Sequence, residues 1–231
     1  MNRQRATPRL SVIIPALDER QTIGDVLDDL AGLRDAGHEV ILVDGGSSDA
    51  TPRIAAPGVD KVLRSDRGRA RQMNAGARAA SGDVLWFLHA DCRIPAGAAQ
   101  QVIDGCARGP IWGRFDVRLS GAATLLRIVE TLMNLRSRLT GIATGDQAIF
   151  VRRDAFDRIG GFPDQPLMED VEISRRLRAI GRPACLRARV VTSGRRWDAH
   201  GAWRTIRLMW RLRWRYWRGE SPQSLAEAYR R

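Results

Sequence analysis

L-W-F-L-H-A-D-C-R, residues 85–93, is the most informative segment of the chain. It begins with a continuous apolar run rich in aromatic and branched residues, which is typical of a strand buried on both faces of a parallel sheet. The chain then turns polar at His89 and acidic at Asp91, and I-P-A-G (94–97) ends the strand. Because ligands of open α/β sheets bind outside the carboxyl ends of the strands, the segment predicts a buried strand with a ligand site at its end.

The residues at this strand end fit a metal site. An aspartate two residues after a histidine can ligate a hard cation, and that cation can hold a phosphate. The alternative is an ordinary turn in which Asp91 only caps backbone amides. Taken alone the turn is the simpler interpretation, but the segments around it favour a ligand site.

The chain before this segment alternates strands with helices. Pro15 is expected to end the first strand, and Asp18 or Thr22 to cap the helix that follows. Gly37 is expected to close that helix. Strands alternating with helices predict βαβ units and a parallel sheet. The predicted strands span 10–14, 39–43 and 61–63.

After Asp91 the order of elements is less regular. The segment I-W-G-R-F-D-V-R-L (111–119) alternates in a way that favours an edge or antiparallel strand. With 231 residues, 44% of them hydrophobic, the chain can form one large α/β domain, or one domain with a small appendage. Further helices are expected at 96–107, 122–139 and 168–181, and strands within 144–156 and at 187–191.

The cysteines exclude two classes of small scaffold. Cys92, Cys106 and Cys185 are odd in number and have no C-x-x-C spacing, which argues against a disulfide framework and a structural zinc site. We therefore expect a reducing compartment, the cytoplasm. The basic N-terminus leads directly into a strand, so we expect no signal peptide. Since no apolar stretch approaches 18 residues, we expect no membrane-spanning helix.

The net charge of +12 predicts an anionic partner. Lys61 is the only lysine, so nearly all the positive charge is arginine. A basic balance of this size suits a phosphorylated substrate, a membrane surface or nucleic acid.

Three acids follow consecutive predicted strands of the first half, Glu19, Asp44 and Asp91. The carboxyl ends of parallel strands share one edge of the sheet, so these acids are expected to converge on one cleft. Between them lies a basic segment suited to a diphosphate, although its arginines also fit a solvated helix face. The loop V-D-G-G-S-S-D-A-T (43–51) matches neither G-x-G-x-x-G nor a P-loop. The basic segment contains Arg67, Arg69, Arg71 and Asn74.

Four motifs together carry a family resemblance. V-I-I-P-A-L-D-E, V-D-G-G-S-S-D-A-T, W-F-L-H-A-D and M-E-D-V-E-I-S-R-R-L occur in this order over roughly residues 9–200. They resemble the family 2 glycosyltransferases with a GT-A fold, an α/β fold with a Rossmann-like, mostly parallel sheet flanked by helices. The closer likeness is to a bacterial subgroup with H-A-D in place of D-x-D and T-S-x-R-R-W near the end.

The resemblance implies a set of site residues. Asp91, with His89, would bind Mn²⁺ or Mg²⁺ on the donor diphosphate, and Asp170, beside Glu169, would be the general base. His89 replaces the first aspartate of D-x-D, which favours weaker or dispensable metal binding. Asp146 and Gln147 are expected on the acceptor side, with Arg195, Arg196 and Trp197 closing over the diphosphate. The nucleotide would be held by Pro15, Ala16, Glu19, Asp44, Gly45, Arg71, Asn74 and Ala90.

The implied reaction is sugar transfer, with inversion, from a nucleotide-diphosphate sugar to an acceptor hydroxyl or phosphate. The resemblance does not identify the acceptor, for which a lipid phosphate or a small molecule is expected. One alternative is a non-catalytic, basic membrane- or nucleic-acid-binding protein on a degenerate transferase scaffold. Another is a nucleotidyltransferase, which is expected to carry a Gly-rich basic loop where this chain has P-A-L-D-E.

Residues 201–231 are predicted to be a basic helical tail on a domain of residues 1–200. Tryptophans and arginines follow the same helical spacing between 203 and 218, and no acid interrupts them. The tail suits an anionic membrane surface, which would place the protein peripherally on the inner face of the membrane. Equally, its Trp face can pack on the domain or on a second subunit of a homodimer. Nucleic acid is the least favoured partner, because the tail has no nucleic-acid-binding motif.

Overall fold

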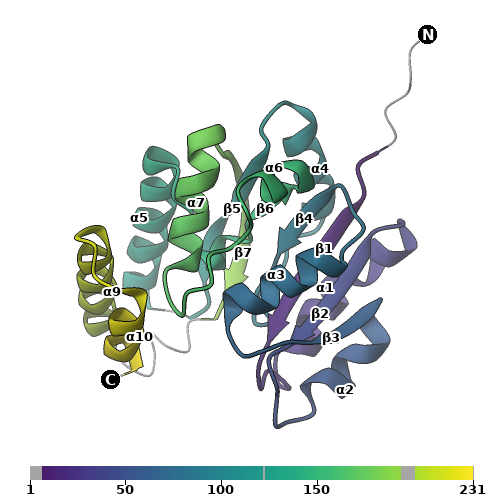
Figure 1. Cartoon of the computed structure of the whole chain (residues 1–231), viewed down its shortest axis with the longest axis horizontal. Coiled ribbons are helices and arrows are strands. Elements are labelled where there is room, and N and C mark those ends of the chain that lie inside the picture. Colours follow the sequence, from purple (N-terminus) through teal and green to yellow (C-terminus); the bar gives the residue numbers. More distant parts are fainter. Residues whose placement is uncertain (1–6, 122, 194–200, 231) are drawn as a thin grey trace.

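The computed structural model describes residues 7–121, 123–193 and 201–230. Within them one sheet of seven strands has the order β3-β2-β1-β4-β6-β5-β7 (Figure 1). β1 is parallel to β2 and β4, and β2 to β3, whereas β6 is antiparallel to both of its neighbours. The strands are β1 (Leu10–Ala16), β2 (Glu39–Asp44), β3 (Lys61–Arg64), β4 (Val84–Phe87), β5 (Trp112–Leu119), β6 (Phe150–Arg152) and β7 (Ala184–Thr192).

Helices cover both faces of the sheet. Alternate side chains of β1 enter two separate apolar layers, as the period of two along a strand requires. α1, α2 and α4 pack on one face, and α3, α6 and α7 on the other. The helices are α1 (Ile23–Asp35), α2 (Thr51–Ala55), α3 (Arg69–Ala79), α4 (Ala98–Ala107), α5 (Thr124–Thr140), α6 (Arg153–Arg158), α7 (Glu169–Ile180), α9 (Ala202–Trp217) and α10 (Pro222–Arg230). Two short 3₁₀ turns, η1 (Ala56–Gly58) and η2 (Gly145–Gln147), complete the described elements.

The central strand agrees with the sequence-based prediction. Every residue of β4 is buried, between β1 and β6. The predicted α/β fold with a mostly parallel sheet is confirmed.

One local expectation was wrong, and the structure resolves two others that left alternatives open. β1 does not end before Pro15 but continues to Ala16. Proline has no amide to donate, and β1 tolerates it because the pairing of β1 with β4 already ends at Ile13 and Phe87. β5 is antiparallel to β6 as expected, but it is not an edge strand, because β7 pairs along its other side. Of the two residues expected to cap α1, Thr22 occupies the N-cap position, without a side-chain hydrogen bond to the helix. The Asp18 carboxylate instead accepts the amides of Ser48 and Asp49.

A buried ion pair ties the amino edge of the sheet together. Glu39 is 3% exposed and accepts hydrogen bonds from Lys61 Nζ at 2.7 Å and Ser11 Oγ at 2.6 Å. Ser81 donates both its amide and its hydroxyl to the same carboxylate. Burial alone would raise the pKa of Glu39, but these hydrogen bonds lower it from 4.5 to about 2.

We expect Glu39→Gln to lower the free energy of unfolding at pH 7 by about 3 kcal/mol. Since the folded-state pKa lies below the ordinary value, this stability is present above pH 4.5 and is lost as the pH falls towards 2. Urea unfolding at several pH values measures it, with the exposed Asp35→Asn as control. A Glu39→Gln protein with wild-type stability at pH 7 would contradict the expectation.

The C-terminal helices pack on the domain, but not through their tryptophans. Leu212 of α9 and Leu225 of α10 are buried against Met168, just before α7. The four tryptophans of α9 stay 55–82% exposed, so the expectation that the Trp face packs on the domain was wrong. A different face, with Leu208, Met209 and Tyr216, makes that contact. No helix in the described part of the chain is long and apolar enough to cross a bilayer.

Candidate functional site

A cleft of about 740 Å³ lies where the carboxyl ends of β1 and β4 meet α3, α7 and α10. It gathers residues that are far apart in the sequence, including several that sequence analysis assigned to one site. The assigned residues that line it are Pro15, Ala16, Glu19, Arg71, His89, Ala90, Asp91 and Glu169. Arg67 and Arg69 line it as well. Of the three acids expected to converge, Glu19 and Asp91 meet in the cleft, whereas Asp44 does not line it.

Two loops at one side of the cleft are fastened to each other. Asp18, in the left-handed conformation with φ 55°, accepts hydrogen bonds from the Ser48 amide at 2.7 Å and the Ser48 hydroxyl at 3.0 Å. Thr51 Oγ1 accepts the Glu19 amide at 2.8 Å. Asp44 accepts the amides of Gly46 and Ser47 and is only 6% exposed. Asp44 therefore shapes the Gly-rich loop, and its contact with a nucleotide stays a prediction.

Gln72 is a structural residue of the site that sequence analysis missed. Its buried amide donates hydrogen bonds of 2.8 Å to the carbonyl oxygens of Ala16 and Val43, and so joins the ends of β1 and β2. A Cβ on Gly45 would lie 3.0 Å from the Gln72 side chain. Glycine at position 45 thus permits this close approach. The polar Gln72 in a basic, solvent-facing segment gave no signal of such a contact.

The residues of the basic segment, at and just before the start of α3, have different partners. Arg71 pairs with Asp164 at 2.8 Å on the rim of the cleft. Asn74 instead holds the 160–166 loop, since its side chain donates to the Phe162 carbonyl at 2.8 Å and accepts the Phe162 amide at 3.0 Å. Arg67 and Arg69 extend into the cleft. Asn74 does not line the cleft, so its assignment to the nucleotide stays a prediction.

His89 points towards the loop that begins η2. Its Nδ1 lies 3.4 Å from Asp146 Oδ1, and a Cβ on Gly145 would lie 2.6 Å from its Nε2. Burial would raise the pKa of Asp146, but the hydrogen bond and charge of His89, with Arg69 and Arg213, hold it below the usual value. His89 and Asp146, which sequence analysis assigned to the metal and to the acceptor side, thus contact each other, and the sequence did not reveal this contact.

Asp91 suits a cation shared with a substrate. It lines both the cleft and a neighbouring pocket. Within the described residues no three acidic, His or Cys side chains gather into a metal cage. Mg²⁺ and similar hard cations bind through one or two carboxylates plus substrate phosphates, so a single accessible carboxylate fits them. The metal assignment of Asp91 and His89 stays a prediction.

Glu169 and Asp170 open α7 beside the cleft. Asp170 Oδ2 accepts the Gly145 amide at 2.9 Å, and its Oδ1 accepts the Val171 amide at 2.7 Å. Glu169 is buried, and this burial and the charge of Asp170 raise its pKa. The preceding Met168 has φ 65°, a conformation costly for a side-chain-bearing residue, and Leu212 and Leu225 hold it. The tail helices therefore support the turn that presents the two acids.

Arg136 of α5 brings a cationic group within electrostatic reach of Asp170. Its Nε and Nη2 are buried and have no hydrogen-bond partner among the described residues. Burial and the charges of Arg213 and Arg114 lower the pKa of Arg136 to about 10, while Asp170 opposes that shift. A buried cation without a partner is costly, and an anionic ligand would complete its hydrogen bonds.

The remaining acceptor-side predictions have different outcomes. Gln147 is fully buried, and its side-chain oxygen accepts the Thr144 amide at 3.1 Å, so it stabilises η2 from inside the protein. Its predicted part in acceptor binding can only be indirect. Arg195, Arg196 and Trp197 lie outside the described residues.

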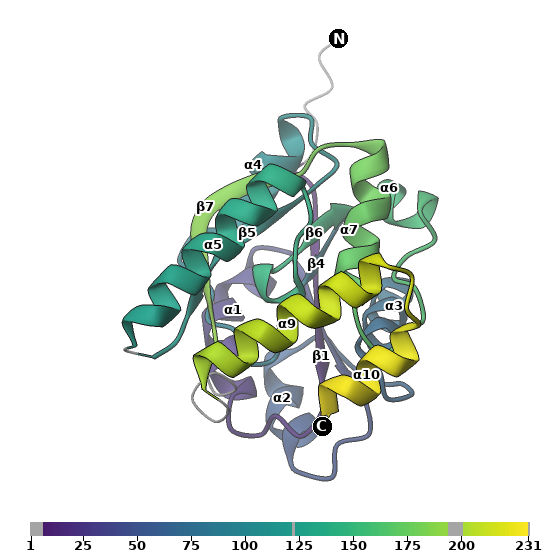
Figure 2. The same ribbon diagram turned by 90° about the vertical axis from the view of Figure 1, so that its left-hand side faces the viewer.

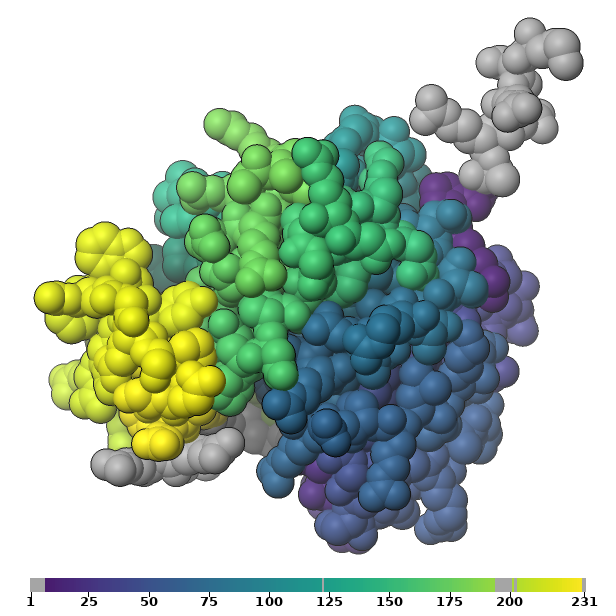
Figure 3. Space-filling view, in the orientation of Figure 1, coloured from purple at the N-terminus to yellow at the C-terminus, as the bar shows by residue number. Residues whose placement is uncertain are grey.

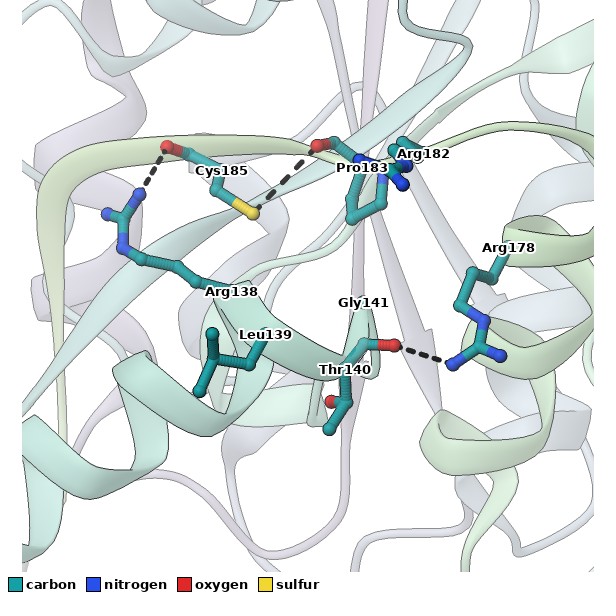
Figure 4. Close-up of a pocket in the computed structure, with 8 residues that line it drawn as sticks. All are labelled: Arg138, Leu139, Thr140, Gly141, Arg178, Arg182, Pro183 and Cys185. Atoms are coloured by element: carbon teal, nitrogen blue, oxygen red, sulfur yellow. Dashed lines mark hydrogen bonds between the residues drawn. The ribbon is translucent and has the colours of Figure 1, made fainter.

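A second pocket, of about 540 Å³, lies where the C-terminal ends of α5 and α7 meet the start of β7 (Figure 4). Two of the arginines that line it are already bonded. Arg138 donates to the Cys185 carbonyl and to Asp116, and Arg178 donates to the Thr140 carbonyl. These bonds join α5, α7 and β7, so we interpret the residues around this pocket as structural.

The sheet order and the cleft at the carboxyl ends of its strands define a GT-A-type domain. The profile of Glycosyl transferase family 2 matches residues 11–160, so the chain belongs to this family. The predicted family and the predicted class of enzyme, a glycosyltransferase, are thereby confirmed. The subgroup features, H-A-D and T-S-x-R-R-W, stay predictions, as does a domain boundary near residue 200.

Individual proteins of this family resemble the chain. It is 31% identical over 174 residues to the PGL/p-HBAD biosynthesis glycosyltransferase of Mycobacterium bovis, covering 68% of this chain and 64% of that protein. It is 27% identical over 238 residues to the probable glycosyltransferase YdaM of Bacillus subtilis, covering 92% and 55%. The chain spans about half the length of several curated relatives that it matches.

A solved structure shares the fold. The mannosyltransferase PcManGT of Pyrobaculum calidifontis, solved in complex with GDP-Man and Mn²⁺, has a TM-score of 0.70 and 21% sequence identity. The similarity covers 97% of this chain and 70% of that one.

Proposed function

We propose that the protein transfers a glycosyl group, with inversion, from a nucleotide-diphosphate sugar to an acceptor hydroxyl or phosphate. The observation that carries this proposal is the gathering of basic and acidic side chains in one cleft. Arg67, Arg69 and Arg71 line it together with Asp91 and Glu169, and Asp170 follows Glu169 in the chain. Such a cleft can neutralise a diphosphate and accept a proton at separate positions.

On the donor side, Asp91 would hold Mn²⁺ or Mg²⁺ together with the two phosphates. The cation would supply Lewis-acid stabilisation of the charge that develops on the leaving group. The arginines of the cleft add fixed positive charge to the same region. The mannosyltransferase of the same fold was solved with a nucleotide sugar and Mn²⁺, which supports this choice of donor and cation.

On the acceptor side, Asp170 would take the proton of the acceptor hydroxyl. Its oxygens hold the Gly145 and Val171 amides and keep lone pairs available for that proton. The acceptor oxygen then bonds to the anomeric carbon, and the bond from this carbon to the phosphate oxygen breaks with its electrons leaving on the diphosphate. Arg136, beside Asp170, favours an acceptor that carries a phosphate, on a lipid or on a small molecule.

The family match removes the support for a nucleotidyltransferase. For residues 203–218, the exposed tryptophans leave an anionic membrane surface or a second subunit as the partner.

Titration calorimetry with GDP, UDP and their sugars tests the proposal. We expect one of these nucleoside diphosphates to bind, its affinity to rise with Mn²⁺, and the corresponding sugar nucleotide to be hydrolysed slowly without acceptor. AMP serves as control, because it lacks the diphosphate that the arginines and the cation recognise. If no nucleoside diphosphate bound with or without Mn²⁺, the proposal would be wrong.

A further inference from the structure

Exposed apolar side chains concentrate on two helices. Eight of the ten large hydrophobic side chains that are exposed in the described residues belong to α5 and α9. Each set follows helical spacing and forms one stripe. Scattered exposed hydrophobics are ordinary, but a contiguous group of this size marks an interaction surface. The stripes are Ile128, Leu132, Leu135 and Leu139 on α5, and Trp203, Trp210, Trp214 and Trp217 on α9.

The two stripes lie on one side of the molecule. Ile206 of α9 packs with Met133, Leu126 and Val129 of α5, so the two helices touch at this residue. Figures 1 and 2 both place α5 and α9 side by side, and in Figure 2 both lie in front of the sheet. Each helix turns its opposite side inward, with Glu130 and Asn134 of α5 and Leu212 of α9 buried. We refer to the eight side chains as the α5–α9 face.

The charge beside this face has one sign. Four exposed arginines flank the tryptophans along α9, and Arg218 lies over the Trp214 ring at 4.9 Å. Glu130 is the only acid in α5 and in residues 202–218, and it is buried. The exposed arginines are Arg204, Arg207, Arg211 and Arg218.

We propose that the α5–α9 face docks the protein on an anionic lipid bilayer, with both helices lying in the plane of the interface. Tryptophan suits the headgroup level, where its ring is apolar and its N–H is solvated. The α5 side chains would reach the acyl region, and the arginines would contact lipid phosphates.

Charge complementarity selects lipid over a second copy of the chain. A self-association through this face would bring the arginines of two copies together without an exposed acid on either helix to pair with them. An anionic bilayer supplies that pairing. In Figure 3 the C-terminal helices form one protruding end of the molecule.

Docking would bring the bilayer close to the cleft. α10 packs on α9, and its Gln223, Ala226 and Tyr229 line the cleft. The membrane proposal itself does not depend on the identity of the donor or acceptor.

Vesicle co-sedimentation tests the proposal. The wild-type chain should bind vesicles made of phosphatidylcholine and phosphatidylglycerol in roughly equal parts. Its affinity for vesicles of phosphatidylcholine alone should be at least tenfold lower. Salt at about 1 M, where charges are screened within about 3 Å, should release it. Leu132→Ser with Leu135→Ser should weaken binding at least tenfold, although it removes no charge. A variant that combines Arg204→Gln, Arg207→Gln, Arg211→Gln and Arg218→Gln should lose the preference for anionic vesicles.

A matched control uses exposed hydrophobics elsewhere. Ile54→Ser on α2 with Val62→Ser on β3 changes side chains that are 41% and 42% exposed, away from α5 and α9, and should leave vesicle binding unchanged. The melting temperature should change little in all these variants, which separates lost docking from lost folding. Failure of the wild type to bind anionic vesicles, or wild-type binding by the Leu132/Leu135 variant, overturns the proposal. A dimer in sedimentation velocity that this variant dissolves would assign the face to a second copy instead.

Discussion

Replacing Asp170 by Asn is expected to lower kcat by about two to four orders of magnitude, the usual range for the loss of a general base. The affinity for the donor should stay close to that of the wild type. Asn has the same shape, and its one carbonyl oxygen can still accept the Gly145 amide, so the contact between α7 and η2 is largely kept. The neutral amide cannot take a proton from the acceptor, and this difference is what the rate measures.

The control for this substitution is an acid in the same helical turn. Glu172 pairs with Arg175 and Arg176, away from the cleft, and Glu172→Gln should keep kcat within a factor of a few. Single-turnover assays and donor titrations on both variants separate chemistry from binding. Near-normal turnover in Asp170→Asn would move the base to Glu169 or Asp146. Loss of donor binding would place Asp170 on the nucleotide side.

The sequence was sufficient to predict what depends on local pattern. The apolar run of β4 identified a strand that is buried on both faces, and the polar residues after β1 and β4 identified a shared edge. Both follow from the period of the chain and from the geometry of parallel strands. Helix α1, with Ile23, Val26, Leu27 and Leu30 buried, also follows from spacing alone.

Contacts between residues far apart in the sequence could not be predicted from local patterns. Gln72, which bonds to Ala16 and Val43, carries no local mark of its role. Asn74 was assigned to the nucleotide by its place in a basic segment, yet its amide holds Phe162, 88 residues away. Such pairings depend on tertiary structure, and a short polar residue on a helix suits many of them equally well.

For the C-terminal tail, too, the sequence was not sufficient to predict which face of the helix is buried. Helical spacing correctly grouped the tryptophans of residues 203–217 into one stripe, but spacing does not say which stripe is buried. The smaller apolar stripe with Leu208 and Leu212 fills the space beside Met168 instead. The bulky tryptophans therefore stay on the surface, as does an apolar stripe of α5. That α5 and α9 would be neighbours could not be predicted from spacing.

The second large effect is expected for Asp91→Ala. A cation on the leaving diphosphate contributes several kcal/mol of transition-state stabilisation, so its loss should lower kcat/KM by about 10²–10³-fold. Nucleoside-diphosphate binding should weaken as well, and added Mn²⁺ should no longer improve it. Donor titrations with and without Mn²⁺ measure this directly, apart from any assay of turnover.

Two comparisons show whether Asp91 itself is responsible. Asp25 also lines the neighbouring pocket, but it is 62% exposed and pairs with Arg93 at 3.6 Å, so Asp25→Ala should keep the wild-type response to Mn²⁺. His89→Ala should keep most of that response too, since the imidazole is directed at Gly145 and Asp146. If Asp91→Ala kept the wild-type affinity and response to Mn²⁺, Asp91 would be a turn residue. The positive charge opposite the diphosphate would then have to come from Arg67, Arg69 and Arg71 alone.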